Sequence, residues 1–88
     1  MMLYKEIEKT FPMMEKVLTK KEMTAFRDTP TGDLCRYHFS LGAWIRNSLL
    51  RPENSVLYSL FLENGVEHLD DMSSCIITLF HYHISKKG

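Results

Sequence analysis

Long apolar segments are absent from this sequence. No stretch approaches the roughly 20 apolar residues that a membrane-spanning helix needs. The first ten residues carry Lys5, Glu6, Glu8 and Lys9, and they lack the apolar core of a secretion signal. We therefore expect a cytoplasmic protein that does not bind membranes.

Cysteine is scarce and a net charge is missing. The only two cysteines, Cys35 and Cys75, fall in segments that we expect to be helix interiors, so they could pair only if those helices face each other closely. We favour free, buried thiols in a reducing compartment. The 11 Lys and Arg residues balance the 11 Asp and Glu residues, so no general basic field draws the chain to nucleic acid.

Glycine-rich loops and paired metal-ligand motifs are missing as well. Without a phosphate-binding loop, a nucleophile elbow or a Cys-x-x-Cys pair, the chain shows no pattern typical of catalysis or of a closed zinc site. His81 and His83 are two residues apart and would point to different faces of a helix. We expect no catalytic residues, no cofactor and no metal. A small metal protein or enzyme using Cys35, His38 and His68 stays open as a remote alternative.

What the chain does contain is the composition of one folded domain. Hydrophobic residues make up 44% and charged residues 25% of the 88 positions, which is ordinary for a globular protein. We expect a single helical domain over 1–88, with fraying possible only in its end segments, 1–10 and 85–88.

Apolar residues recur every three or four positions along most of the chain, which is the helical pattern. We therefore predict an all-α bundle of four to five short helices. The first stripe runs through Leu3, Ile7, Phe11, Met14 and Leu18, and Pro12 makes it two short helices or one kinked helix. Thr19 and Glu22 then fit a capping box at the start of a short helix that points Met23 and Phe26 inward.

Three later helices complete the prediction. The first covers about 33–48 and contains Gly42, whose cost inside a helix makes sense if another helix backbone crosses closely there. The second is short, turns Val56, Leu57, Leu60 and Phe61 inward, and stops at Asn64 and Gly65. The last begins near Asp70 or Asp71 and carries two apolar stripes, so we expect it to be the most buried.

Four acids lie between positions 63 and 71 with no Lys or Arg among them: Glu63, Glu67, Asp70 and Asp71. A basic partner could bind this stretch. Alternatively, it is a solvated turn with acids placed at a helix start, where they are stabilising in any case. The same acids could serve a structural clamp, in which Arg46 pairs with Asp70 or Asp71 and Asn47 holds loop carbonyls.

Arginines and aromatic residues gather near one predicted helix. Arg36, Arg46 and Arg51, with Tyr37 and Trp44, include the residue types of a nucleic-acid recognition helix. Arg36 and Arg46 are ten residues apart and share a face only loosely, and their surroundings are not basic. We therefore interpret Trp44 as packing and keep a nucleic-acid-associated regulatory domain as the first alternative.

Two sequence blocks carry a family resemblance. They are His38-Phe-Ser-Leu-Gly-Ala-Trp-Ile-Arg-Asn47 and Gly65-Val-Glu-His-Leu-Asp-Asp-Met-Ser73, followed by Ile76-Ile-Thr. The chain resembles a bacterial family of short helical domains of unknown function, with His-x-x-Leu-Gly-x-x-Ile-Arg-Asn and His-Pro-Asp-Asp-Met-Ser blocks, over about 11–84. Leu69 stands where that family usually has proline. The resemblance implies a helical fold and brings no established activity.

Size and the missing catalytic groups suggest a protein-binding module. Small cytosolic chains of this kind are typical of immunity proteins, which neutralise bacterial toxins. The mechanism would be steric: the acids at 63–71, with exposed aromatics such as Tyr58 or Tyr82, would cover the basic active site of a toxin domain such as a nuclease. The predicted partner is therefore a protein.

Overall fold

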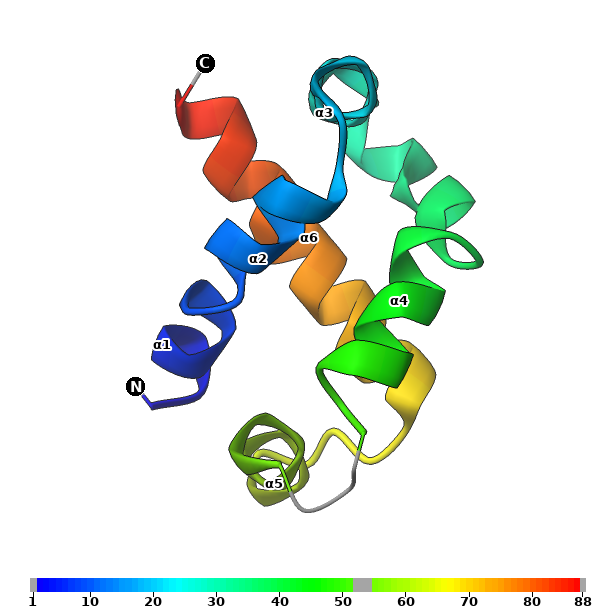
Figure 1. Cartoon of the computed structure of the whole chain (residues 1–88). Helices are drawn as coiled ribbons and strands as arrows, with labels where there is room; N and C mark the ends of the chain where they lie inside the picture. The colour runs from blue at the N-terminus through cyan, green and yellow to red at the C-terminus, as the bar shows by residue number, and fades with distance from the viewer. Residues whose placement is uncertain (1, 52–54, 88) are drawn as a thin grey trace.

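The computed structural model describes residues 2–51 and 55–87, and within these ranges it is all helical (Figure 1). The all-α prediction is confirmed. The described residues form six α-helices and one 3-10 helix, more pieces than the four to five expected. They are α1 (Met2–Glu8), α2 (Phe11–Val17), α3 (Lys20–Asp28), η1 (Thr31–Tyr37), α4 (Leu41–Ser48), α5 (Val56–Glu63) and α6 (Leu69–Lys87).

Helix α6 is the centre of the domain. It is 19 residues long, and α3, α4 and η1 all pack against it, while α1 packs against α5. In Figure 1, α1 and α2 lie on one side of α6 and α4 lies on the other. Five buried apolar side chains come from α6: Met72, Ile76, Ile77, Phe80 and Ile84. The expectation of a last helix with neighbours on several sides therefore agrees with the structure.

The N-terminal stripe forms two helices, which was one of the two predicted alternatives. Pro12 lies in the first turn of α2, where its missing N–H removes no helix hydrogen bond. The Thr10 hydroxyl donates to the carbonyl of Ile7 over 2.6 Å and helps to close α1. Ile7 is buried, so this end of the chain contributes to the core.

The capping box before α3 is confirmed. The Thr19 hydroxyl accepts from the backbone N–H of Glu22 over 3.1 Å, and the Glu22 carboxylate accepts from the backbone N–H of Thr19 over 2.9 Å. Phe26, in the same helix, is fully buried, and Met23 is partly buried against the core.

The predicted continuous helix over 33–48 is wrong. The chain forms η1, leaves helical geometry at Ser40 (φ −96°, ψ −85°) and then starts α4. One cause is visible at the break, because the carbonyl of His38 accepts from the Arg46 guanidinium over 3.2 Å instead of from a helix N–H. Gly42 faces the backbone carbonyl of Tyr37 and the side chains of Arg46 and Ile77, and a crossing helix backbone is not among its three nearest neighbours.

Helix α5 differs from expectation at Val56, and Leu60, also expected to face inward, is only partly buried. Leu57 and Phe61 are buried, but Val56 is 61% exposed, because it is the first residue of the helix beside the capping Ser55. Gly65 has φ +83°, the left-handed conformation that ends a helix, as predicted.

Among the described residues, no helix has the length and apolar character needed to cross a bilayer.

Candidate functional site

The side chain of Arg46, on α4, holds the beginning of α6. One guanidinium nitrogen, Nη1, donates to the Ser73 hydroxyl over 3.1 Å, and Nη2 donates to the carbonyl of His38 over 3.2 Å. Ser73 is fully buried and donates its own hydroxyl hydrogen to the carbonyl of Asp70 over 3.0 Å. We call Arg46, Ser73 and Asp70, with the His38 carbonyl, the polar node. It joins α4, α6 and the turn before α4.

The predicted clamp is present in part within this node. Arg46 Nη1 lies 3.8 Å from Asp70 Oδ1, a single long contact and not the bidentate pair expected. Asn47 and Asp71 are exposed, and no hydrogen bond or ion pair joins either to Arg46 in the described part of the chain. The sequence analysis missed Ser73, although its place in the second family block, three residues after Asp70, was the available signal.

The side chain of His38 connects the node to a neighbouring groove. Its Nε2 atom lies 3.8 Å from Asp70 Oδ1, and its ring meets the ring of Phe39 edge to face, with centroids 4.9 Å apart at 84°. Phe39 is 86% exposed. Periodicity gave no signal for this exposure, because it depends on the break between η1 and α4.

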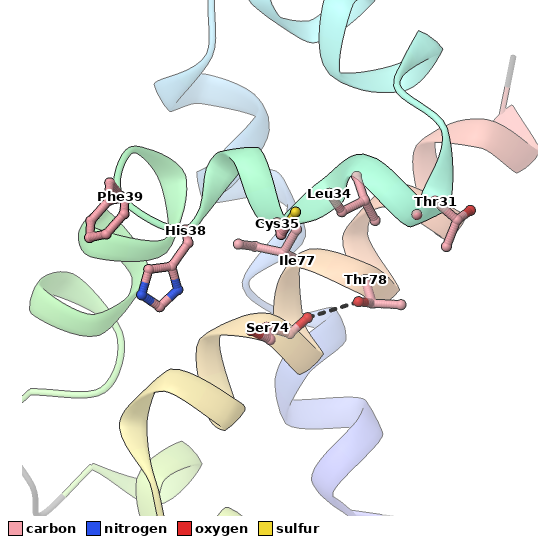
Figure 2. Close-up of a pocket in the computed structure, with 9 residues that line it drawn as sticks. Thr31, Leu34, Cys35, His38, Phe39, Ser74, Ile77 and Thr78 are labelled. Atoms are coloured by element: carbon pink, nitrogen blue, oxygen red, sulfur yellow. Dashed lines mark hydrogen bonds between the residues drawn. The ribbon is translucent and has the colours of Figure 1, made fainter.

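A groove of about 510 Å³ lies between η1 and α6, with His38 and Phe39 at one end and Thr31 toward the other (Figure 2). No Lys, Arg, Asp or Glu lines it. Ser74 and Thr78 form its α6 side, where the Thr78 hydroxyl donates to the Ser74 carbonyl over 2.9 Å. The remaining lining residues are Gly32, Leu34, Cys35 and Ile77.

The two cysteines are free, as expected, but they are not both buried. Cys35 is exposed on η1 and lines the groove, whereas Cys75 is half-buried on α6. Burial raises the pKa of the Cys75 thiol. Figure 2 shows the Cys35 sulfur and the His38 ring pointing in different directions, so the two side chains do not form a nucleophile–base pair.

All four acids of the 63–71 stretch are exposed, and we call them the acidic edge: Glu63, Glu67, Asp70 and Asp71. They lie at the end of α5, in the connection after it and at the start of α6. Tyr58 is only partly exposed and packs against the core. Tyr82 is 60% exposed but comes twelve residues after Asp70, about 18 Å along the axis of α6. The aromatic residues expected beside the acids are therefore not exposed next to them.

The two alternative site predictions gather fewer of their residues. Arg46 is only 17% exposed and belongs to the polar node, while Arg36 is exposed, 4.0 Å from Asp33. Trp44 and Tyr37 pack partly buried against the core. In the described residues, no three His, Cys, Asp or Glu side chains are placed to hold a metal ion. His68 does not line the groove that Cys35 and His38 share.

The fold and the site define a small all-α domain with an internal polar node, an uncharged groove and an exposed acidic edge. The chain belongs to a family of domains of unknown function, DUF6794, whose match covers residues 5–84. Comparisons with curated proteins and with solved structures find no match. The resemblance to a family of unknown function is thereby confirmed, and the polar node brings together residues from both sequence blocks that carried it.

Proposed function

We propose that this chain is a non-catalytic protein-binding domain whose acidic edge docks onto a basic surface of its partner. The observation that carries the proposal is the exposure of all four acids from the end of α5 to the start of α6, with no Lys or Arg between positions 63 and 71. Within the described residues, Glu63, Glu67 and Asp71 have no ion pair with a basic side chain. Such an uncompensated acidic surface speeds association with a basic partner and selects against acidic ones.

The partner that best fits this chemistry is a toxin domain such as a nuclease. A nuclease must attract phosphates, so its active-site surface is basic and complements the acidic edge. Covering that surface blocks the enzyme sterically and needs no chemistry from the inhibitor. We therefore propose a bacterial, cytoplasmic immunity or antitoxin protein, a role that an isolated small domain can fulfil.

The geometry favours binding over catalysis. The Arg46 guanidinium is directed at Ser73 and at the His38 carbonyl, so it stabilises the fold and is not presented to a substrate. His38 and Cys35 share the groove without facing each other. The side chains that could take part in catalysis therefore do not point toward one common position.

Charge reversal tests the proposal. The chain would be co-expressed with the product of the neighbouring reading frame, and the affinity of the purified pair would be measured at low and moderate salt. We expect Glu67→Lys to weaken the complex about tenfold and to flatten its salt dependence. Glu8→Lys is the matched control, because Glu8 lies with Tyr82 beside the C-terminal half of α6. Equal affinity of the wild type and Glu67→Lys would refute the acidic-edge mechanism.

A further inference from the structure

We infer that the groove between η1 and α6 is the docking site for an amphipathic helix of the partner, with its apolar side chains in the groove and its Lys or Arg residues over Asp70 and Asp71. This inference rests on the proposed protein-binding function, because it names the part of the partner that is recognised. It adds a second binding surface beside the acidic edge. It also fixes which end of the partner helix lies over Asp70 and Asp71.

The groove has the chemistry of a side-chain acceptor. Its floor includes Leu34 and Ile77, which are nearly buried at 7% and 4% exposure. Residues with small side chains or none also line it, namely Gly32, Ser74 and Thr78. Figure 2 shows Ser74 and Thr78 on its α6 side. Small lining residues let another backbone approach closely, and the apolar floor favours an apolar side chain over water.

Phe39 supplies an anchor at one end of this groove. Single exposed apolar residues are common on protein surfaces, but this ring is 86% exposed, borders a groove and is supported from one side by the His38 ring. Aromatic residues beside a pocket are the typical energetic centres of protein interfaces. An apolar side chain entering the groove would cover the free face of Phe39.

The charges around the groove differ between its two ends. Asp70 and Asp71 precede Ser74 by four and three residues, so they lie one turn away on the same side of α6. Arg46 lies 3.8 Å from Asp70 and compensates part of its charge, whereas Asp71 has no basic partner among the described residues. This end is therefore negative.

Along η1 and just before it, the charges occur as compensated pairs. Arg27 lies 3.4 Å from Asp28, and Asp33 lies 4.0 Å from Arg36. Opposite charges so close cancel at the distance of a bound partner. Charge complementarity therefore calls for a partner segment that is basic at one end only, the end over Asp70 and Asp71.

A helix is the segment type that fits. The described residues contain no strand whose edge could accept an extended peptide, and two helices, η1 and α6, form the walls of the groove. From Asp70 to Thr78 the α6 wall spans eight residues, about 12 Å. That length accommodates two turns of a partner helix with apolar side chains at positions i, i+4 and i+7.

Defined peptides provide the first test. Three peptides of about 15 residues, long enough for an isolated helix, would be titrated into the isotope-labelled chain and followed by NMR. One carries Leu at i, i+4 and i+7 with Lys in its last turn, the second replaces Lys by Glu, and the third scrambles the first. We expect only the first to shift the amides of Phe39, Ser74 and Thr78. Absence of these shifts, or equal binding of the acidic or scrambled peptide, would overturn the inference.

A groove-filling variant provides the second test. A Cβ atom added at Gly32 meets nothing within 4 Å, and Gly32 does not have a positive φ, so Gly32→Trp places a large ring at the groove without straining the backbone. We expect it to weaken the basic peptide about tenfold or more while the circular dichroism spectrum stays unchanged. If Gly32→Trp does not fold, Phe39→Ser replaces it, since that side chain is almost fully exposed. A folded variant that binds the peptide as the wild type does would overturn the inference.

The two proposals can fail separately. With the natural partner, a complex weakened by Glu67→Lys but unaffected by Gly32→Trp leaves the acidic edge in place and removes the groove. A complex unaffected by Glu67→Lys removes the proposed function itself. Glu67 does not line the groove, so the two variants do not alter the same surface.

Discussion

The two halves of α6 are held in place by different physical means. In the C-terminal half, Phe80 packs between the rings of Phe11 and Phe26, with centroids 5.5 Å from each. In the N-terminal half, directional polar contacts from Arg46 fix Ser73 and approach Asp70. Both halves contain buried apolar residues, but only the N-terminal half has a buried hydroxyl as its connection to another helix.

The difference separates stability from positioning. Packed aromatic rings bury large apolar areas and contribute most of their free energy without a demanding geometry. A guanidinium–hydroxyl contact contributes little net free energy, because it replaces hydrogen bonds to water, but it is satisfied in only one arrangement. We conclude that the aromatic half supplies stability, whereas the polar node orients the start of α6. The acidic edge and the open groove lie next to the node.

Phe80→Ala should have the largest effect on stability. Phe80 is fully buried, and removing a buried Phe costs about 3–5 kcal/mol in lost burial and cavity formation. Domains of this kind are stable by only about 5–15 kcal/mol in total, so this loss is a large share of the free energy of unfolding. Urea unfolding followed by circular dichroism measures the loss, and the exposed Tyr82→Ala is the control, expected within about 0.5 kcal/mol of the wild type. Similar losses for the two variants would contradict the division of roles.

Arg46→Ala should have the next largest effect. It removes the guanidinium donor of the His38 carbonyl and of the Ser73 hydroxyl, which keeps its own bond to the Asp70 carbonyl, and hydrogen bonds to a charged group contribute about 1.5–3 kcal/mol. Asp70→Asn should cost less than about 1 kcal/mol, since the Asp70 side chain is 69% exposed. Urea unfolding of both variants measures these costs. Arg46→Lys should recover only part of the loss, because an ammonium cannot span the two acceptors as the planar fork does. A larger cost for Asp70→Asn than for Arg46→Ala would show that the ion pair dominates the node.

The same division explains how far the sequence could predict the structure. Local signals were sufficient where one short motif decides the outcome: the Thr19–Glu22 capping box and the stop at Gly65 both form as predicted. The break between η1 and α4 was not predictable from periodicity. At the break, the His38 carbonyl accepts from the guanidinium of Arg46, eight residues later, and apolar spacing does not reveal such a side-chain contact.

The candidate site was predictable to a similar degree. The charge count located the acidic edge, and opposite charges suggested the contact between Arg46 and Asp70, which lie 3.8 Å apart. Ser73 and the groove were missed. A serine's burial depends on which helix crosses it, and the groove exists only because η1 and α6 pack side by side. Neither property is encoded in local spacing.

Gly42→Ala tests how tightly the polar node is packed, and its expected effect is smaller. A Cβ atom at this position would lie 3.1 Å from Arg46 Nη1 and 3.3 Å from the Tyr37 carbonyl oxygen. Alanine favours a helix interior by about 0.5–1 kcal/mol over glycine, but crowding a packed site costs about 1–3 kcal/mol. We expect a net loss of about 1 kcal/mol in urea unfolding. In an Arg46→Ala background the loss should shrink, because the nearest neighbour is gone. Additive effects of the two substitutions on the free energy of unfolding would show that the Arg46 side chain moves away from the added Cβ atom at little cost.

The smallest effect is expected from Cys75, which lies half-buried in the N-terminal half of α6. Burial raises the pKa of its thiol above the ordinary value because desolvation disfavours the thiolate. The folded state therefore holds this proton more tightly than the unfolded chain, so the contribution of Cys75 to the free energy of unfolding is greatest below the unfolded pKa and is lost as the pH rises from the unfolded to the folded pKa. The free energies of unfolding of the wild type and Cys75→Ala should therefore differ by a constant amount at pH values below the ordinary thiol pKa. Above that pKa the difference should change with pH.

A Cys35→Ser background isolates this effect, because Cys35 is exposed and its thiol is open to reagents. In that background the difference in unfolding free energy between Cys75 and Cys75→Ala should be independent of pH up to about pH 8 and shift in favour of alanine at higher pH. A disulfide reagent should also label Cys75 more slowly than it labels Cys35 in the wild type, since only the thiolate reacts. Equal labelling rates would show that the N-terminal half of α6 opens to solvent as readily as η1 does. In that case the polar node would not hold the start of the helix in place.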